Sequence, residues 1–341
     1  MNMAFTREFV LLTLLPAFAL LGQLAALPST SVASEDANKK PLAVILDTDI
    51  GDDIDDTWAL GLLLKSPELD VKLVVGDYGK AEYRAKLLAK LLQAAGRTDI
   101  PVGMGLRLNP DAQGPQAEWV KDYDLKSYPG KIHEDGVQAI IDTILGSQEP
   151  ITLIAIGPLP NIAAALEREP RIAQRARFVG MHGSVRLGYG GSSTPAAEWN
   201  VRADPKSCAK VFTAPWEMTI TPLDTCGLIQ LRGEKYKALR GSPDPIARTL
   251  MENYRLWCGK DPGRADRESS TLFDTVAVYL AFSRDLCVME RLGVSVKDDG
   301  FTVIDEKAKA MDCAMEWKDL GAFEDLLVKR IGGVEASPSA K

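Results

Sequence analysis

Six carboxylates fall within ten residues near the start of the chain, between Asp47 and Asp56. They directly follow the apolar run from Leu42 to Leu46, and Gly51 among them permits the tight turn that would end a strand. Carboxylates at this density repel one another unless a cation holds them together. An all-oxygen ligand set suits a hard divalent cation such as Ca²⁺ or Mg²⁺. The pattern therefore predicts a metal site at the carboxyl end of a first strand, in preference to a solvated acidic loop.

Strand and helix patterns alternate along the rest of the chain and would position this acidic cluster. Short apolar runs predict strands over 42–46, 71–75, 151–156, 178–181 and 218–220. Apolar residues at helical spacing predict helices over 58–64, 81–96 and 133–145, and a further helix that begins at 162. Such alternation favours an α/β fold, a single domain over residues 41–335 with an open, mostly parallel sheet and helices on both faces.

Three segments give no clear pattern of strand or helix. They are 109–131, 188–197 and the charged stretch 240–270. Long loops in compact domains often bind ligands, so the first two are candidates for binding segments.

Residues 1–33 have the features of a signal peptide for export. Arg7 precedes an apolar run over 9–27, and Ser31-Val32-Ala33 offers small residues for cleavage. Pro16 and Gln23 interrupt the run, which weakens the alternative of an uncleaved membrane anchor. Residues 34–40 form a predicted linker. We therefore expect a periplasmic or secreted protein with no membrane association after the signal is cleaved.

Charge and cysteine content limit the possible partners. The 341-residue chain carries a net charge of −7 and has no basic patch, which argues against nucleic-acid binding. No two of its five cysteines have the spacing of a zinc or redox motif. An oxidising compartment could pair some of them, and the odd number leaves at least one outside any internal disulfide. These features argue against a nucleic-acid partner and against a zinc or redox site.

Four segments, in order along residues 42–280, together resemble the calcium-dependent nucleoside hydrolases of the inosine-uridine type. They are the acidic cluster, Gly157-Pro158-Leu159-Pro160-Asn161, Pro195-Ala196-Ala197-Glu198-Trp199-Asn200 and Asp274 ahead of Ala277-Val278. The resemblance implies a Rossmann-like nucleoside hydrolase fold and Ca²⁺ as the cofactor. It implies hydrolysis of the N-glycosidic bond of ribonucleosides, or of a related riboside, to ribose and free base. A homodimer or homotetramer is the expected assembly.

The resemblance also assigns roles to the acids. It places Asp49, Asp56 and Asp274 as metal ligands, with the backbone carbonyl of Ile156 as a fourth. It makes Asp55 the general base that takes a proton from the attacking water, while oxocarbenium character develops at the sugar.

Four other residues are expected to contact the substrate. Glu198 and Asn200 are two residues apart, so in an extended segment both would point the same way and could hold ribose hydroxyls. Asp77 stands where the family usually has asparagine, which predicts an anionic contact with the sugar or base. His182 follows a predicted strand at the ligand-binding edge, where the alternative is a turn histidine bonded to the backbone.

The position of the adjacent aspartate pair depends on how the family pattern is aligned. Counting from Asp47 starts the pair at Asp53, but Ile54 then follows and cannot bind metal. Counting back from the next helix gives Asp55-Asp56, with two residues inserted in the turn. We prefer this second alignment because it supplies two carboxylates.

Phe273 precedes Asp274 where many members carry a histidine that protonates the leaving base. Stacking by Tyr254, Trp257 or Trp119, or another proton donor, could compensate. The missing acid also motivates an alternative function, a secreted calcium-stabilised protein that binds ribosides or a partner without turnover. A haloacid-dehalogenase-type phosphatase, suggested by acids after a first strand, gives no role to residues 198–200.

Overall fold

The computed structural model describes residues 40–109, 112–261 and 263–333. These described residues form one compact unit. The predicted signal peptide and residues 34–39 of the predicted linker lie outside the described residues. Among the described helices, none is long and apolar enough to cross a bilayer.

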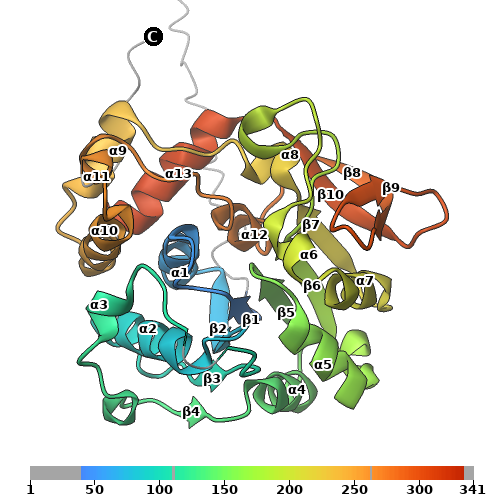
Figure 1. Cartoon of the computed structure of the whole chain (residues 1–341), viewed down its shortest axis with the longest axis horizontal. Helices are drawn as coiled ribbons and strands as arrows, with labels where there is room; N and C mark the ends of the chain where they lie inside the picture. Colours follow the sequence, from blue (N-terminus) through green and yellow to red (C-terminus); the bar gives the residue numbers. More distant parts are fainter. Residues whose placement is uncertain (1–39, 110–111, 262, 334–341) are drawn as a thin grey trace, which may run out of the picture. The chain divides into compact units, whose positions relative to one another are not determined.

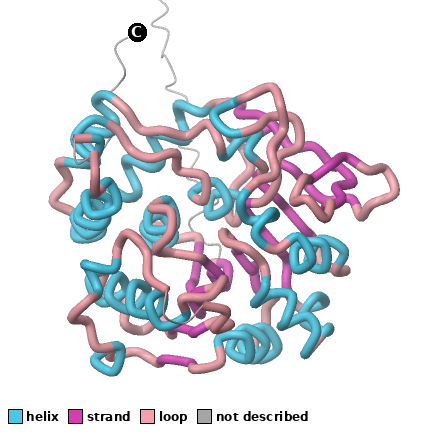
Figure 2. Tube along the Cα trace, in the orientation of Figure 1, coloured by secondary structure: helices cyan, strands magenta, loops and turns pink. Residues whose placement is uncertain are grey.

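Ten strands form one sheet in the order β4-β3-β2-β1-β5-β6-β7-β10-β8-β9. The strands are β1 (Leu42–Thr48), β2 (Leu69–Gly76), β3 (Val102–Met104), β4 (Ile132–His133), β5 (Ile151–Ala155), β6 (Ala176–Met181), β7 (Met218–Thr221), β8 (Cys287–Val296), β9 (Thr302–Ile304) and β10 (Ala310–Trp317). All neighbours pair in parallel except β10 with β8 and β8 with β9. The predicted open, mostly parallel sheet is therefore confirmed, with an antiparallel extension at one edge. Figure 2 shows the strands of the sheet in magenta between the helices.

Helices cover both faces of this sheet (Figure 1). They are α1 (Asp55–Leu64), α2 (Ala81–Ala94), α3 (Ala117–Val120), α4 (Gly136–Gly146), α5 (Pro160–Arg168), α6 (Trp199–Ala203), α7 (Pro205–Thr213), α8 (Leu223–Cys226), α9 (Gly233–Arg240), α10 (Pro245–Cys258), α11 (Arg264–Arg267), α12 (Thr275–Leu280) and α13 (Leu320–Gly332). Short 3₁₀ turns are η2 (Leu125–Ser127), η3 (Pro170–Gln174) and η4 (Tyr189–Gly191). One apolar core joins the sheet to α4, α5 and α7, and the other joins it to α1, α2, α10, α12 and α13.

The strand order reverses next to β1, and this point locates the ligand site. The chain runs outward from β1 through β2, β3 and β4, then returns to place β5 on the other side of β1. Loops after β1 and β5 therefore diverge and leave a crevice at the carboxyl ends of these strands, the usual ligand position in open α/β sheets. In β1, Val44 and Leu46 face one core and Ile45 faces the other, as expected for a strand buried on both faces.

Two predictions about local structure are wrong. His133 does not open a helix but ends β4, and α4 begins after the capping residue Asp135, whose side chain accepts from Gln138 N at 2.9 Å. The stretch 240–270 is largely helical rather than irregular. Asp244 caps α10 by accepting from Ile246 N at 2.8 Å, and Pro245 occupies the first turn, where it needs no hydrogen-bond donor.

The five cysteines are all buried and unpaired (Cys208, Cys226, Cys258, Cys287 and Cys313). The described part of the chain is therefore held by its two apolar cores without disulfides.

Candidate active site

Three buried aspartates from distant parts of the chain meet at the carboxyl end of β1. Asp55 and Asp56 open α1, and Asp274 caps α12, which packs beside α1. One carboxylate oxygen from each lies within 4.8 Å of the other two. The backbone N–H of Asp274 donates to Asp55 Oδ2 at 3.2 Å, and Thr48 Oγ1 donates to Asp56. Each acid is at most 3% exposed. This geometry suits a divalent cation with oxygen ligands.

Burial and mutual repulsion make this group of acids costly to ionise. Burial raises the pKa of Asp55, Asp56 and Asp274 well above the usual range, and the neighbouring carboxylates raise it further. Burial also raises the pKa of Asp49 to about 6, although the Arg84 guanidinium opposes that shift. A bound cation would reverse these shifts because it favours the charged forms.

The turn between β1 and α1 is held by a buried arginine that the sequence analysis did not identify. Arg84 of α2 is fully buried, and its guanidinium donates to the carbonyls of Asp49 and Ile50, the latter at 2.7 Å. It also donates to Asp52 Oδ2 at 2.9 Å. Lys80 forms a second ion pair with Asp52. These cations bind the backbone and Asp52, and the carboxylates of Asp49, Asp55 and Asp56 form no ion pair with a side chain of the described residues.

The geometry favours the alignment that begins the aspartate pair at Asp55. Asp53 is exposed and its carboxylate accepts from Ile54 N at 2.7 Å, while the Ile54 side chain is buried in the apolar core. Asp52 is occupied by its two cations. Asp55 and Asp56, in contrast, lie in the group with Asp274.

Glu198, Asn200 and Ile156 line the same cavity as the acids. The expected extended segment is wrong, because Glu198 caps α6 and Asn200 lies in its first turn. Glu198 accepts from Asn200 N at 2.7 Å and from Gly183 N at 2.9 Å. Asn200 Nδ2 donates to the Ile156 carbonyl at 3.1 Å. The helix thus brings both side chains to the cavity by a route different from the predicted one.

Glu198 also has a shifted pKa. Burial raises the pKa of its carboxyl group to about 7, although three backbone N–H groups lower it. The side chain can therefore change its protonation state when a ligand binds beside it.

The cavity lined by these groups is small, about 110 Å³. It lies where the segments after β1, β5 and β6 meet α6 and α12. Its other lining residues include three aromatic side chains, Tyr189, Trp199 and Phe273. Tyr254, Trp257 and Trp119, considered for stacking from the sequence, do not line it. Trp257 instead donates to the Asp52 carbonyl at 3.1 Å.

Asp77 is buried beside Asp47 and does not line the cavity. Its carboxyl group is fully buried against that of Asp47, and neither of its oxygens accepts a hydrogen bond from an N–H group of the described residues. Burial and the neighbouring Asp47 and Asp49 raise its pKa well above the usual range. A protonated Asp77 can donate to Asp47, as an asparagine amide would. The expectation of an anionic contact is therefore not supported by this environment.

His182 is buried and does not line the cavity. Its Nε2 lies 3.0 Å from the Gly157 carbonyl, and Phe178 and Phe212 flank the ring. Burial lowers the pKa of His182 to about 4, so the ring is neutral and Nε2 must carry the hydrogen that bonds Gly157. Gly157 in turn needs to be glycine, since a Cβ there would lie 2.8 Å from both Asp49 Oδ1 and Asp77 Oδ2. This contact matches the backbone-bonded alternative for His182.

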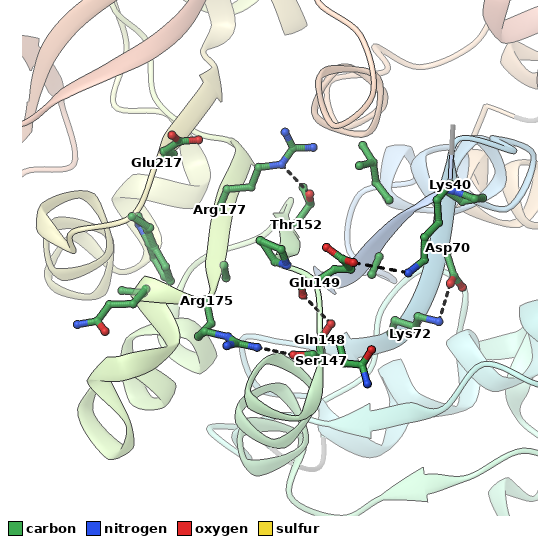
Figure 3. A pocket seen from close by; sticks show the side chains of 18 of the residues that line it. Lys40, Asp70, Lys72, Ser147, Gln148, Glu149, Thr152, Arg175, Arg177 and Glu217 are labelled. Carbon is green, nitrogen blue, oxygen red and sulfur yellow. Dashed lines mark hydrogen bonds and ion pairs between the residues drawn. The ribbon is translucent and has the colours of Figure 1, made fainter. Parts of the chain in front are cut away.

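A larger hollow of about 990 Å³ lies at the opposite, amino-terminal edge of the strands (Figure 3). Several charged side chains that line this hollow form ion pairs with one another. Lys40 Nζ lies 3.9 Å from Glu149 Oε1, and Lys72 Nζ lies 2.5 Å from Asp70 Oδ2. It has no group of buried acids among the described residues that line it. The chemistry of the chain is therefore concentrated in the smaller cavity.

The raised pKa values of the aspartates predict how stability depends on pH once metal is removed. Above about pH 4 the unfolded chain releases protons that the native acids of the site retain. The contribution of these acids to the stability of metal-free protein is therefore greatest in acid and falls as pH rises. A bound cation favours the ionised acids and offsets this loss. We expect stripping of metal to lower the melting temperature more at about pH 8 than at about pH 5, as calorimetry would measure. An equal decrease at both pH values would contradict this electrostatic account.

Comparison with known proteins identifies the family. The family model described as inosine-uridine preferring nucleoside hydrolase matches residues 44–324. The chain belongs to this family. It is therefore a nucleoside hydrolase, an enzyme that cleaves ribonucleosides, as the resemblance implied.

Relatives and solved structures agree with this assignment. The chain is 31% identical to the pyrimidine-specific ribonucleoside hydrolase RihA of Escherichia coli O127:H6, over 62% of this chain and 70% of that protein. It is 33% identical to RihA of Enterobacter sp. strain 638, over 62% and 69%. The plant nucleoside hydrolase PpNRh1 superposes with a TM-score of 0.74 at 22% identity, over 86% of this chain and all of that one. A purine-preferring ribonucleoside hydrolase from Gardnerella vaginalis gives 0.69 at 23%, over 85% and 98%. These two structures support the fold.

Members of the family depend on a metal ion, and the buried group of Asp55, Asp56 and Asp274 could hold one. The family and the structure thus support the predicted cation site.

Proposed function

We propose that this chain is an exported, calcium-dependent hydrolase that cleaves ribonucleosides to ribose and free base, with Asp55 as the general base. The meeting of Asp55 and Asp56 with Asp274, more than two hundred residues later in the chain, is the observation that carries the proposal. A protein that only bound ribosides would not need so costly a group of buried acids beside the sugar-binding residues. The alternative without turnover is therefore the weaker hypothesis.

The proposed reaction uses the acids in two ways. Ca²⁺, held by Asp49, Asp56, Asp274 and the Ile156 carbonyl, would orient a water and sugar hydroxyls and lower the pKa of that water. Asp55 removes a proton from the water as it attacks the anomeric carbon. The N-glycosidic bond breaks as this carbon gains oxocarbenium character.

Residues of α6 would hold the ribose. The oxygens of Glu198 accept backbone N–H groups but keep lone pairs for sugar hydroxyls. Asn200 uses its Nδ2 for the carbonyls of Ile156 and Met181, at 3.1 and 3.0 Å, which fixes the side chain beside the cavity. Asp77 and His182 would act indirectly. Asp77 contacts Asp47, and His182 bonds the Gly157 carbonyl, next to Ile156.

The exported state rests on the sequence of residues 1–33, whose basic residue, apolar run and small residues are typical of a cleaved signal. Mass spectrometry of protein recovered from the periplasm or medium should find the mature N-terminus near Ala33. Retention of the full chain in the cytoplasm would contradict export. The expected homodimer or homotetramer can be measured on the same sample by light scattering.

Hydrolysis itself is tested with a panel of purine and pyrimidine ribonucleosides and one activated riboside, p-nitrophenyl riboside. We expect release of ribose from at least one nucleoside, and faster release from the activated riboside because Phe273 cannot protonate a departing base. Phe273→His should narrow the difference, since it restores an imidazole next to Asp274. A flat dependence of rate on leaving-group pKa in the unaltered protein would mean that another residue of the cavity supplies the proton.

A further inference from the structure

The proposed function leaves the source of the leaving-group proton open, and the cavity contains a hydroxyl group that could supply it. Tyr189 lines the cavity and is 45% exposed. Its ring contacts Phe273 edge to face, with centroids 6.0 Å apart at 83°. The phenol ring therefore lies against the residue that occupies the usual histidine position.

The hydroxyl of Tyr189 is oriented but its hydrogen is free. Its Oη accepts the backbone N–H of Trp199 at 2.9 Å, at the start of α6. The phenol O–H donates to no acceptor among the described residues, so its hydrogen is available to a ligand in the cavity. Burial and the nearby Glu198 carboxylate raise the pKa of Tyr189 to about 12, which keeps the phenol protonated. Tyr189 thus links the sugar-binding residues of α6 to Phe273 on the other wall.

The loop that carries Tyr189 is fixed by another buried acid, Asp224 of α8. Its carboxylate accepts three successive backbone N–H groups, from Val185 at 2.9 Å, Arg186 at 2.7 Å and Leu187 at 3.1 Å. Three charge-assisted hydrogen bonds to one carboxylate make a rigid turn. Tyr189 follows two residues later, and its hydroxyl is then held by Trp199. The hydroxyl is therefore pre-positioned before substrate binds.

We propose that Tyr189 donates its phenolic hydrogen to the departing nucleobase, in place of the histidine that Phe273 replaces. This proposal rests on the proposed hydrolase function. As the bond from the anomeric carbon to the base nitrogen breaks, its electron pair passes to the base, which takes the proton from Tyr189. Water supplies the hydroxyl group to the anomeric carbon and its proton to Asp55. Transfer of that proton to solvent and reprotonation of the phenolate complete the cycle.

The exposed indole of Trp199 would orient the nucleobase next to the Tyr189 hydroxyl. Trp199 is 45% exposed at the cavity, and Arg202 covers its ring at 5.3 Å from the centroid. A planar base leaving the sugar would pass between the aromatic side chains Tyr189, Trp199 and Phe273. Aromatic planes at this position favour a flat heterocycle over a second sugar as the leaving group.

The test compares inosine with p-nitrophenyl riboside in Tyr189→Phe, which keeps the ring and removes only the hydroxyl. We expect kcat/KM for inosine to fall by about 10²-fold, as for loss of a general acid, while p-nitrophenyl riboside changes little because nitrophenolate leaves unprotonated. Tyr123→Phe, which removes a surface hydroxyl bonded to Gln93 at 2.9 Å, is the matched control and should alter neither rate. Phe273→His in the Tyr189→Phe background should recover inosine hydrolysis.

Each outcome separates this role from a structural one. An equal loss on both substrates would overturn the donor role, because displacement of Trp199 would slow every riboside alike. An unchanged rate with inosine would overturn it as well. If Tyr189→Phe fails to fold, Phe273→His alone decides, because a donor already present at Tyr189 leaves little for an added imidazole to do. A small gain in inosine hydrolysis supports the proposal, and a gain of about 10²-fold contradicts it. Failure of the unaltered protein to cleave either riboside would instead refute the proposed function.

Discussion

Asp55→Asn should lose roughly 10²-fold or more in turnover of ribonucleosides while the protein still binds them. The amide keeps the shape of the carboxylate but cannot take a proton from the attacking water. Asp55 Oδ2 already accepts the backbone N–H of Asp274 at 3.2 Å, so the side chain is held in place by a contact that the amide oxygen can retain. Steady-state kinetics, with binding followed by calorimetry, separates the loss of chemistry from loss of affinity.

Asp53→Asn is the matched control for this prediction. Asp53 is a neighbouring acid of the same turn, but it is exposed and bonds Ile54 N at 2.7 Å. We expect only a small change in turnover. A severe loss in Asp53→Asn with a mild one in Asp55→Asn would place the catalytic pair two residues earlier. Normal turnover in both variants would refute a carboxylate base in this turn.

The second large effect concerns the metal. Purified protein should carry one tightly bound Ca²⁺ per chain, and Asp56→Ala should release it and lower the melting temperature. The ion stabilises the native state by binding it in preference to the unfolded chain. Without the ion, the remaining buried carboxylates of Asp49, Asp55 and Asp274 repel one another. Elemental analysis and calorimetry measure the two consequences separately.

Asp49→Ala tests whether Asp49 is also a ligand of the ion, in addition to the closest group of acids. Asp49 lines the cavity but is not among the three acids whose oxygens approach within 4.8 Å. Asp52→Ala is the control, because this acid is paired with Lys80 and Arg84. Unchanged metal content in both Asp49→Ala and Asp56→Ala would contradict the ligand assignment, and loss of metal in Asp52→Ala alone would move the site.

The acids of the site could be predicted from the sequence because their signals are local. Asp55 and Asp56 follow an apolar strand and open a helix, and the sheet topology fixes where such a turn must lie. The parallel sheet was predictable for the same reason, since apolar runs and helical spacing repeat along the chain. Asp274 and residues 198–200 were placed by resemblance alone, because no local pattern links them to the first turn.

The supporting residues were harder to predict because their roles depend on contacts between distant segments. Arg84 lies on the apolar face of α2 with Ala81, Ala85 and Leu88, and a charged residue in such a stripe was a signal of a buried partner. Asp224 had no such signal, since its three N–H partners belong to a loop nearly forty residues earlier.

Other predictions failed because local patterns admit two conformations. Glu198 and Asn200 reach the cavity from a helix start rather than an extended strand. Glu198 is the N-cap and keeps an extended backbone, while Asn200 already lies in the first turn. The Asp244-Pro245 pair was a helix-start signal within the charged stretch 240–270, where high charge obscured the apolar face of α10. The environment of Asp77 depends on Asp47, thirty residues earlier.

The most direct measurement of the central claim is ribose release from ribonucleosides by metal-stripped protein during titration with Ca²⁺. The account predicts negligible release without metal, and activity that rises in proportion to bound Ca²⁺ and saturates at one ion per chain. Asp55→Asn should bind the same single ion and remain inactive. Full activity in the stripped protein, or saturation with Ca²⁺ and no ribose released from any nucleoside, would contradict the account.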